Sequence, residues 1–222
     1  MTDDPRIRLV AEGYDAIVDR HLDWIGRIEA DPRMRWLEAF TARLPAGGDV
    51  LELGCGAGVP VTARLAERFT VTGVDVSPGQ IGRARELVPA ARLIVGDMTT
   101  IELPGASFDG VAAFYSILHV PRERHAALFG RIAGWLRPGG WFLAALSGHD
   151  DPGWTGRWLG VPMFFSGFAP DVTAGLLSGA GFRVVRRRLK TMREPEEDGT
   201  LSDATFLWVL ARRRRRGPDR SA

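Results

Sequence analysis

The sequence has almost no cysteine or lysine, and it has no long apolar run. Cys55 is the only cysteine among 222 residues, so an intramolecular disulfide is impossible, which fits a reducing cytoplasm. No uncharged apolar stretch approaches ~18 residues. Residues 1–6 include two aspartates and are not followed by the apolar segment of a signal peptide. We therefore expect a cytoplasmic protein with neither a membrane span nor a signal peptide.

The length and charge of the chain limit its number of domains and its kind of partner. A chain of 222 residues with a mean hydropathy of −0.06 is long enough to bury the core of one α/β domain. Lys190 is the only lysine, and five of the arginines form a run at residues 212–216. Such a run is most often a solvated tail, although it is also able to bind phosphate groups. Nucleic acid is therefore the less favoured partner.

A glycine-rich stretch at residues 50–60 is the most informative local pattern. A short apolar run predicts a buried strand, and Gly54, Gly56 and Gly58 follow it at alternate positions before a helical pattern at 61–69. Glycines at such a junction let the backbone turn tightly and approach a ligand. A phosphate loop would need a lysine followed by Ser or Thr, and a dinucleotide fingerprint would need G-x-G-x-x-G. Neither is present, which leaves another ligand or a purely structural turn.

The stretch E-L-G-C-G-A-G resembles the first motif of class I S-adenosylmethionine (SAM) dependent methyltransferases. A second predicted strand, 70–75, ends at Asp75, about twenty residues beyond the first glycine. A carboxylate at that position is able to accept both hydroxyl hydrogens of a ribose, although it would also suit a plain loop. The resemblance assigns further residues to the cofactor: Glu52, Gly54, Cys55, Gly56, Gly58, Val76, Gln80 and Tyr115.

Two more features carry the same resemblance. Gly96-Asp97-Met98 follows a predicted strand at 91–95 and is similar to the family's adenine site. There Asp97 would accept a hydrogen bond from the adenine amino group and Met98 would pack on the ring, whereas the alternative is a turn aspartate. Leu-Arg-Pro-Gly-Gly at 136–140 is recurrent in the family and leads into an apolar strand. The resemblance covers residues 6–211.

The N-terminal residues 6–45 are predicted to form helices that cap the domain. Apolar positions recur at helical spacing, and Asp31 before Pro32 is a plausible N-cap. Tyr14-Asp15-x-x-x-Asp19 resembles the family's lid over the cofactor. Tyr14 is equally consistent with a core aromatic on an amphipathic helix.

Histidine is the candidate general base. His119 follows the predicted strand 108–114 by a few residues and would titrate near neutrality; the alternative is a capping or packing role. His149 is the second choice, and His21 and His125 look like helix-surface residues. No cluster has metal-ligand spacing, so no metal is expected, and G-x-S-x-G is absent.

Substrate recognition is expected from residues 148–169, which show no clean period. This segment lies where the family often inserts a lid, and its aromatics would line a pocket for a ring-bearing substrate or form a local core. Phe-Tyr-Ser-Ile at 114–117 replaces the Asn-Pro-Pro-aromatic box of base-amine methyltransferases, which favours the small-molecule branch. The candidate substrate residues are Trp154, Trp158, Phe164, Phe165 and His149.

Together these features predict one Rossmann-like α/β domain. It would have a seven-stranded, mostly parallel sheet with an antiparallel last strand, helices on both faces and an N-terminal cap. The expected activity is methyl transfer from SAM, leaving S-adenosylhomocysteine (SAH), to O, N or S of a small molecule. The alternatives are a SAM-binding protein that does not methylate and an RNA-directed enzyme; a monomer and a homodimer both remain open. The segments are a cap at 6–45, a cofactor core at 49–147, a lid at 148–169, the end of the core at 170–211 and a basic tail at 212–222.

Overall fold

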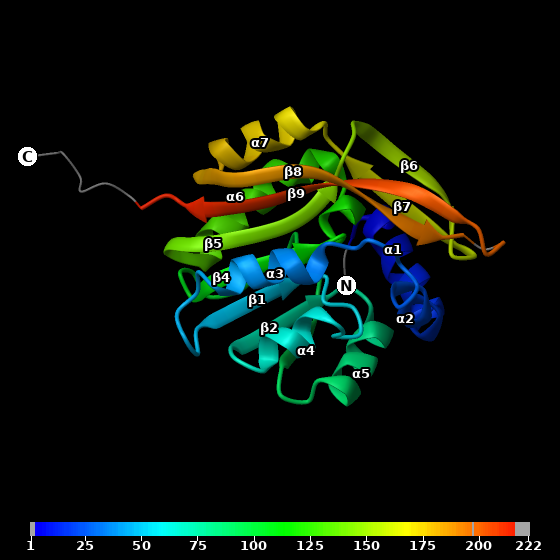
Figure 1. Cartoon of the computed structure of the whole chain (residues 1–222), viewed down its shortest axis with the longest axis horizontal. Coiled ribbons are helices and arrows are strands. Elements are labelled where there is room, and N and C mark those ends of the chain that lie inside the picture. The colour runs from blue at the N-terminus through cyan, green and yellow to red at the C-terminus, as the bar shows by residue number, and fades with distance from the viewer. Residues whose placement is uncertain (1–2, 197, 216–222) are drawn as a thin grey trace, which may run out of the picture.

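A seven-stranded sheet forms the centre of the computed structural model, which describes residues 3–196 and 198–215. The strand order is β3-β2-β1-β4-β5-β9-β8, and β9 runs antiparallel to both of its neighbours while the other pairs are parallel. The predicted fold class is confirmed (Figure 1). The strands are β1 (Asp49–Leu53), β2 (Thr70–Asp75), β3 (Arg92–Val95), β4 (Phe108–Phe114), β5 (Leu136–Ser147), β8 (Phe182–Pro195) and β9 (Leu201–Arg213).

Helices cover both faces of this sheet because every central strand is apolar on both sides. On one face Phe40 and Trp36 pack against Trp208, and on the other Phe129 packs against Phe142. The first face carries α3 (Arg33–Thr41) and α4 (Val61–Ala66), and the second carries α6 (His125–Trp135) and α7 (Pro170–Gly179).

The order of the strands reverses direction between β1 and β4. Chain connections lead from β1 outward to β2 and β3, and then back to β4 on the other side of β1. In open α/β sheets, ligands bind in the crevice at the carboxyl ends of strands at such a point. The helix α5 (Pro78–Leu87) begins at this edge, where Ser77 is the N-cap and its side chain accepts the Gln80 N–H at 3.0 Å.

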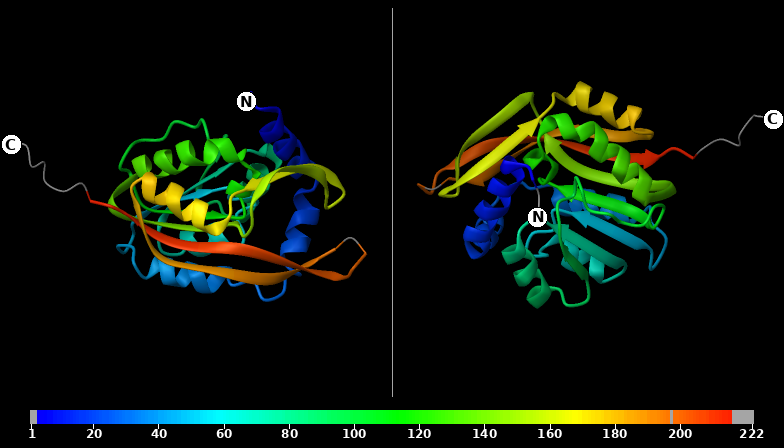
Figure 2. Two further views of the ribbon diagram at one scale, coloured as in Figure 1. Left: turned by 90° about the horizontal axis from the view of Figure 1, so that it is seen from above. Right: turned by 180° about the vertical axis from the view of Figure 1, so that it is seen from behind.

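Two helices and a hairpin, here called the roof, lie over the carboxyl ends of the strands (Figure 2). The helices are α1 (Pro5–Ala16) and α2 (Val18–Ile25), and the hairpin is β6 (Asp151–Trp158) with β7 (Val161–Gly167). Val10 of α1 packs against Met163 and Phe164 of β7. Residues 148–169, whose sequence shows no clean period, contain this hairpin. Most of β6 is exposed on both faces, so it shows no alternation of apolar and polar residues.

The last two strands form a long antiparallel pair. β8 and β9 remain paired out to Pro195 and Leu201. Exposed arginines along β8 hide the strand pattern, and the extension is held because the Trp24 indole donates to the Pro195 carbonyl at 2.9 Å. It brings the ends of β8 and β9 up to the roof.

The predicted basic tail begins later than residue 212. Arg212 and Arg213 belong to β9, and their side chains donate to the carbonyl oxygens of Gly139 and Leu136. Arg214 donates to the Ser178 hydroxyl at 3.2 Å. The rest of the expected tail, 216–222, lies outside the described residues. Within residues 3–196 and 198–215, no helix is long and apolar enough to cross a membrane.

Candidate active site

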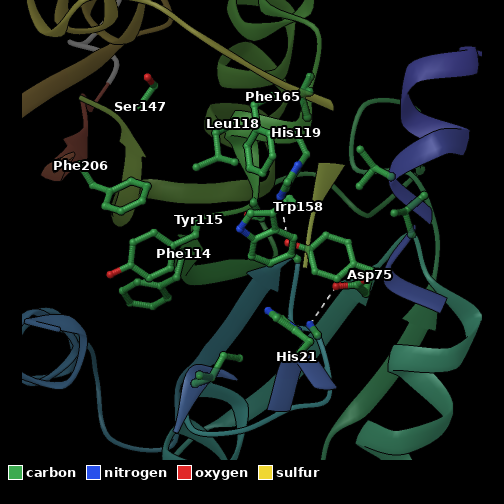
Figure 3. Close-up of a pocket in the computed structure, with 18 of the residues that line it drawn as sticks. His21, Asp75, Phe114, Tyr115, Leu118, His119, Ser147, Trp158, Phe165 and Phe206 are labelled. Carbon is green, nitrogen blue, oxygen red and sulfur yellow. Dashed lines mark hydrogen bonds between the residues drawn. The ribbon is translucent and has the colours of Figure 1, made fainter. Parts of the chain in front are cut away.

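A cavity of about 790 Å³ lies between the carboxyl ends of the strands and the roof. Figure 3 shows His119, Leu118 and Phe165 on one side of it, Tyr115, Phe114 and Phe206 on the other, and Trp158 between them. The structure brings most of the predicted site residues together here. They are Tyr14, Glu52, Gly54, Cys55, Gly56, Asp75, Val76, Asp97, Met98, Tyr115, His119, His149, Trp154, Trp158 and Phe165.

Three predicted site residues do not line the cavity. A Cβ on Gly58, whose φ is +84°, would lie 2.9 Å from Val88, so this glycine allows α5 to pack closely on the loop. Gln80 is fully buried in the first turn of α5. Phe164 packs inside the roof, and only its backbone carbonyl takes part in the site.

Asp75 holds the glycine loop and faces the cavity. Its Oδ2 accepts the Gly56 N–H at 2.8 Å and its Oδ1 accepts the Ser77 N–H at 3.0 Å. Burial raises the pKa of Asp75, and the two backbone hydrogen bonds oppose that rise. Each carboxylate oxygen accepts about two hydrogen bonds, so this group is able to accept two more from a ligand.

One carboxylate oxygen of Asp97 receives no hydrogen bond from the described residues. Its Oδ1 accepts hydrogen bonds from the backbone and the hydroxyl of Thr99, both at 2.8 Å. Its Oδ2 is buried and has no hydrogen-bond partner among the described residues. A buried oxygen left unpaired destabilises a fold by about 1–3 kcal/mol. The position therefore suits a ligand that brings an N–H, and Met98 lies beside it on the cavity wall.

His119 connects the sheet with both halves of the roof. It lies in the 3₁₀ turn Ile117–His119 after β4, and its Nδ1 is 2.8 Å from the Phe164 carbonyl oxygen. That oxygen only accepts, so Nδ1 carries the proton and Nε2 accepts from the Tyr14 hydroxyl at 2.9 Å. Burial lowers the pKa of His119 to about 4, so the imidazole is neutral at neutral pH.

Arg33 is a buried cation in the cavity wall that the sequence analysis did not identify. Its guanidinium pairs with Asp31 at 2.9 Å and lies 4.9 Å from the centre of the Tyr115 ring. The Tyr115 hydroxyl donates to Asp31 at 2.9 Å. The Arg33 Nε is buried and has no hydrogen-bond partner within the described part of the chain. This atom is free to donate to an anionic group of a ligand.

The local sequence predicts only part of this arrangement around Arg33. Asp31 accepts the Arg33 backbone N–H at 2.8 Å, as a residue that starts a helix does, although Pro32 occupies the N-cap position. The Asp-Pro-Arg pattern indicates where a helix begins. It does not indicate that the arginine side chain turns toward the cavity.

Of the two histidines predicted to lie on helix surfaces, His21 is half-buried and His125 is buried. His21 lines the cavity, its ring lies 5.0 Å from that of Tyr14, and burial lowers its pKa to about 3. The His125 Nε2 donates to the Val120 carbonyl at 2.9 Å. Both predictions were wrong because each helix is covered on more than one side, by the roof or by neighbouring loops.

Glu52 is a buried acid whose one side-chain hydrogen bond in the described structure comes from the Thr62 hydroxyl at 2.6 Å. Burial raises its pKa to about 8. Because the folded state holds this proton more tightly than the unfolded chain, whose Glu pKa is about 4.3, Glu52 destabilises the fold increasingly between pH ~4.3 and 8. The stability advantage of Glu52→Gln over wild type should therefore be larger at pH 9 than at pH 5 by roughly 4 kcal/mol of unfolding free energy.

Urea unfolding at the two pH values measures this difference. The matched control is Glu67→Gln, which removes an exposed carboxylate paired with Arg64 and should keep the wild-type pH dependence. An unfolding free-energy difference between Glu52→Gln and wild type that is the same at pH 5 and pH 9 would contradict the prediction.

Comparisons with known proteins find similarity to methyltransferases. Residues 50–140 match a family model described as a methyltransferase domain. A 2-methyl-6-phytyl-1,4-hydroquinone methyltransferase of Synechocystis sp. is 35% identical over 109 residues, which are 46% of this chain and 33% of that protein. An O-methyltransferase of Pyrenophora dematioidea is 34% identical over 173 residues, which are 71% of this chain and 63% of that protein. The chain thus spans less than two thirds of the length of these relatives.

Solved structures agree with the fold. The Burkholderia thailandensis 1,6-didemethyltoxoflavin-N1-methyltransferase, solved with 1,6-didemethyltoxoflavin and SAH bound, superposes with a TM-score of 0.67 at 24% identity, covering 96% of this chain and 92% of that one. The strand order, the glycine loop and the crevice define a Rossmann-like nucleoside-binding domain. Residues 50–140, which carry the glycine loop, Asp75 and Asp97, match a methyltransferase domain, and solved SAM-dependent methyltransferases share the fold that the sequence motifs predicted.

Proposed function

We propose that this protein binds SAM in the cavity and transfers its methyl group to a nucleophilic atom of a small molecule. The observation that carries the proposal is the buried Asp97 Oδ2, which lacks a donor within the described residues in a cavity that the glycine loop and Asp75 also line. The amino group of adenine supplies such a donor. The names of the relatives, a hydroquinone and a didemethyltoxoflavin methyltransferase, support a small-molecule acceptor.

The residues present fit the cofactor along its whole length. Asp97 would accept from the adenine amino group with Met98 against the ring, and Asp75 would accept from the ribose hydroxyls. The Arg33 Nε would donate to the carboxylate of the methionine part. Gly54 and Gly56 leave room for the backbone to approach the ligand, since both have positive φ and no Cβ.

The bound cofactor would supply an activated methyl group on a positively charged sulfur, which leaves as a neutral thioether. The chain's own task is to align the acceptor and exclude water, and alignment alone can contribute ~7–11 kcal/mol. Tyr14 and Trp158 cover the cavity from the roof, with ring centres 5.8 Å apart. Their position over the cavity supports a role in keeping water away.

A protonated acceptor must also lose its proton. His119 remains the proposed base, and in this geometry it would act through Tyr14, because the Tyr14 hydroxyl donates to Nε2. The Tyr14 oxygen keeps lone pairs that are able to receive a proton from the acceptor while its own proton moves to His119. His149, exposed at the cavity mouth, is the second candidate.

Calorimetric titration with SAM, SAH and NADH tests the cofactor, and methyl transfer to a panel of small phenols, amines and thiols tests the reaction. Micromolar binding of SAM and SAH without binding of NADH is expected. Binding of neither sulfur compound would overturn the proposal. Binding without transfer to any acceptor would favour a SAM-binding protein of this fold that does not methylate.

The role of His119 leads to a separate prediction. His119→Ala should lower kcat by about 10²-fold or more and change the SAH dissociation constant by less than about fivefold, because general-base catalysis contributes ~10²–10⁴. His119→Asn keeps an N–H that can donate to the Phe164 carbonyl but has no basic nitrogen. Steady-state kinetics on both variants decide the matter: recovery of kcat in His119→Asn would mean that His119 only holds the roof in place.

A further inference from the structure

The cavity has a second region that the proposed cofactor contacts do not use. Ser147 and His149 at the end of β5, Trp154 and Phe165 of the hairpin, and Phe206 of β9 line it. Asp75 ends β2 and Asp97 follows β3, at the other end of the strand order. A ligand held by those two carboxylates would therefore leave this region open to a second molecule.

Aromatic rings form opposite walls of this region. On the roof side Phe165 lies 5.6 Å from Trp154 and 6.0 Å from Trp158, measured between ring centres. On the sheet side Tyr115 and Phe206 are 4.7 Å apart (Figure 3). Trp154 is 44% exposed although it lines the cavity. Rings arranged in this way stack on a flat apolar ligand, which would cover the exposed indole.

The charge of the same region is negative. Three carboxyl side chains line it, those of Asp151, Glu194 and Asp203, and burial raises the pKa of Glu194 to about 7. Arg33 is the sole arginine or lysine on the described cavity wall, and it pairs with Asp31. Two nearby arginines, Arg122 and Arg193, form ion pairs outside the cavity.

Arg122 pairs with Asp150 at 3.2 Å, and Arg193 pairs with Glu29 at 3.3 Å. Neither arginine lines the cavity. Because Arg33 pairs with Asp31 and, in the proposed function, also holds the carboxylate of SAM, an anionic acceptor would face carboxylates without a further cation to balance it. Like charges placed together disfavour binding strongly.

We infer that the methyl acceptor is a planar aromatic molecule that is neutral or positively charged, and that carboxylate and phosphate analogues are rejected. This inference rests on the proposed function, since it concerns the acceptor of the same reaction. The aromatic walls select the ring, and Asp151, Glu194 and Asp203 select against negative charge.

Binding of four related probes to the SAH complex tests the inference. 2-Naphthol, 2-naphthylmethylamine and 2-naphthoate share one flat ring system and differ in charge, and decahydro-2-naphthol has the hydroxyl without the aromatic ring. Ligand-observed NMR titration should give dissociation constants at least ~10-fold weaker for naphthoate and for the saturated alcohol than for naphthol and the amine. Naphthoate binding as well as naphthol, or none of the four binding, would overturn the inference.

Variants separate the two contributions. Asp151→Asn combined with Asp203→Asn should bring naphthoate within about threefold of naphthol, whereas the neighbouring control Asp150→Asn, outside the cavity, should change neither. Trp154→Ala should weaken all three aromatic probes and leave SAH binding unchanged. SAH affinity is measured first on each sample. Its absence would overturn the proposed function together with this inference, whereas intact SAH binding with an unselective acceptor region overturns the inference alone.

Discussion

Asp75→Asn should weaken SAH binding at least ~100-fold. Hydrogen bonds to a charged group contribute about 1.5–3 kcal/mol each, and the asparagine amide would replace one acceptor oxygen by a donor. The substitution also places that donor against the N–H of Gly56 or Ser77, both of which donate to Asp75 in the structure. A loss of about 3 kcal/mol corresponds to roughly a hundredfold in affinity.

Calorimetric titration of SAH into wild type and Asp75→Asn measures this effect. Asp109→Asn is the matched control, because Asp109 is also a hydrogen-bonded carboxylate, accepting from the Asp49 N–H and from Arg137, but it lies at the amino end of β4. It should lower stability and leave SAH affinity unchanged. An Asp75→Asn variant that binds SAH within threefold of wild type would remove Asp75 from the cofactor site.

Gly54→Ala should destabilise the fold and distort the crevice at the carboxyl ends of the strands. Gly54 has φ +72°, and a Cβ there would lie 2.2 Å from the Ser116 Cβ. A left-handed conformation costs an alanine roughly 1–2 kcal/mol, and the overlap requires a shift of the turn after β4. We expect a loss of more than about 3 kcal/mol in unfolding free energy, together with loss of SAH binding.

Urea unfolding distinguishes strain from overlap. Gly54→Ala combined with Ser116→Gly removes the overlap and keeps the unfavourable φ, so it should recover part of the stability. The control Gly82→Ala lies in α5 with no atom within 4 Å of the new Cβ, and should be neutral or up to about 1 kcal/mol more stable. An unchanged urea midpoint for Gly54→Ala would show that the loop adapts freely.

The sheet and the cofactor end of the site were predictable because their signals are local. Gly54, Gly56, Asp75 and Asp97 each lie at the carboxyl end of a strand or within three residues of it, so the parallel arrangement alone brings them to one edge. The sequence pattern of each strand and the position of its last residue were sufficient for this prediction.

The acceptor end was not predictable because it depends on packing between distant segments. Glu194 reaches the cavity only because β8 continues to Pro195 and Trp24 holds its end. Arg33 turns inward because Asp31 and Tyr115 receive it. The hairpin at 151–167 is ordered by its contact with α1, and its own sequence lacks an alternating pattern.

The position of His119 has a consequence for hydrogen exchange. Its two ring nitrogens join Tyr14 of α1 to the backbone of β7, so neither half of the roof can lift without breaking a bond to the same imidazole. Amide protons of α1 and β7 should therefore exchange with one common opening free energy, well below that of the strands β1 and β4. The roof would then be a single cooperative unit, and its opening would set the rate at which ligands enter and leave.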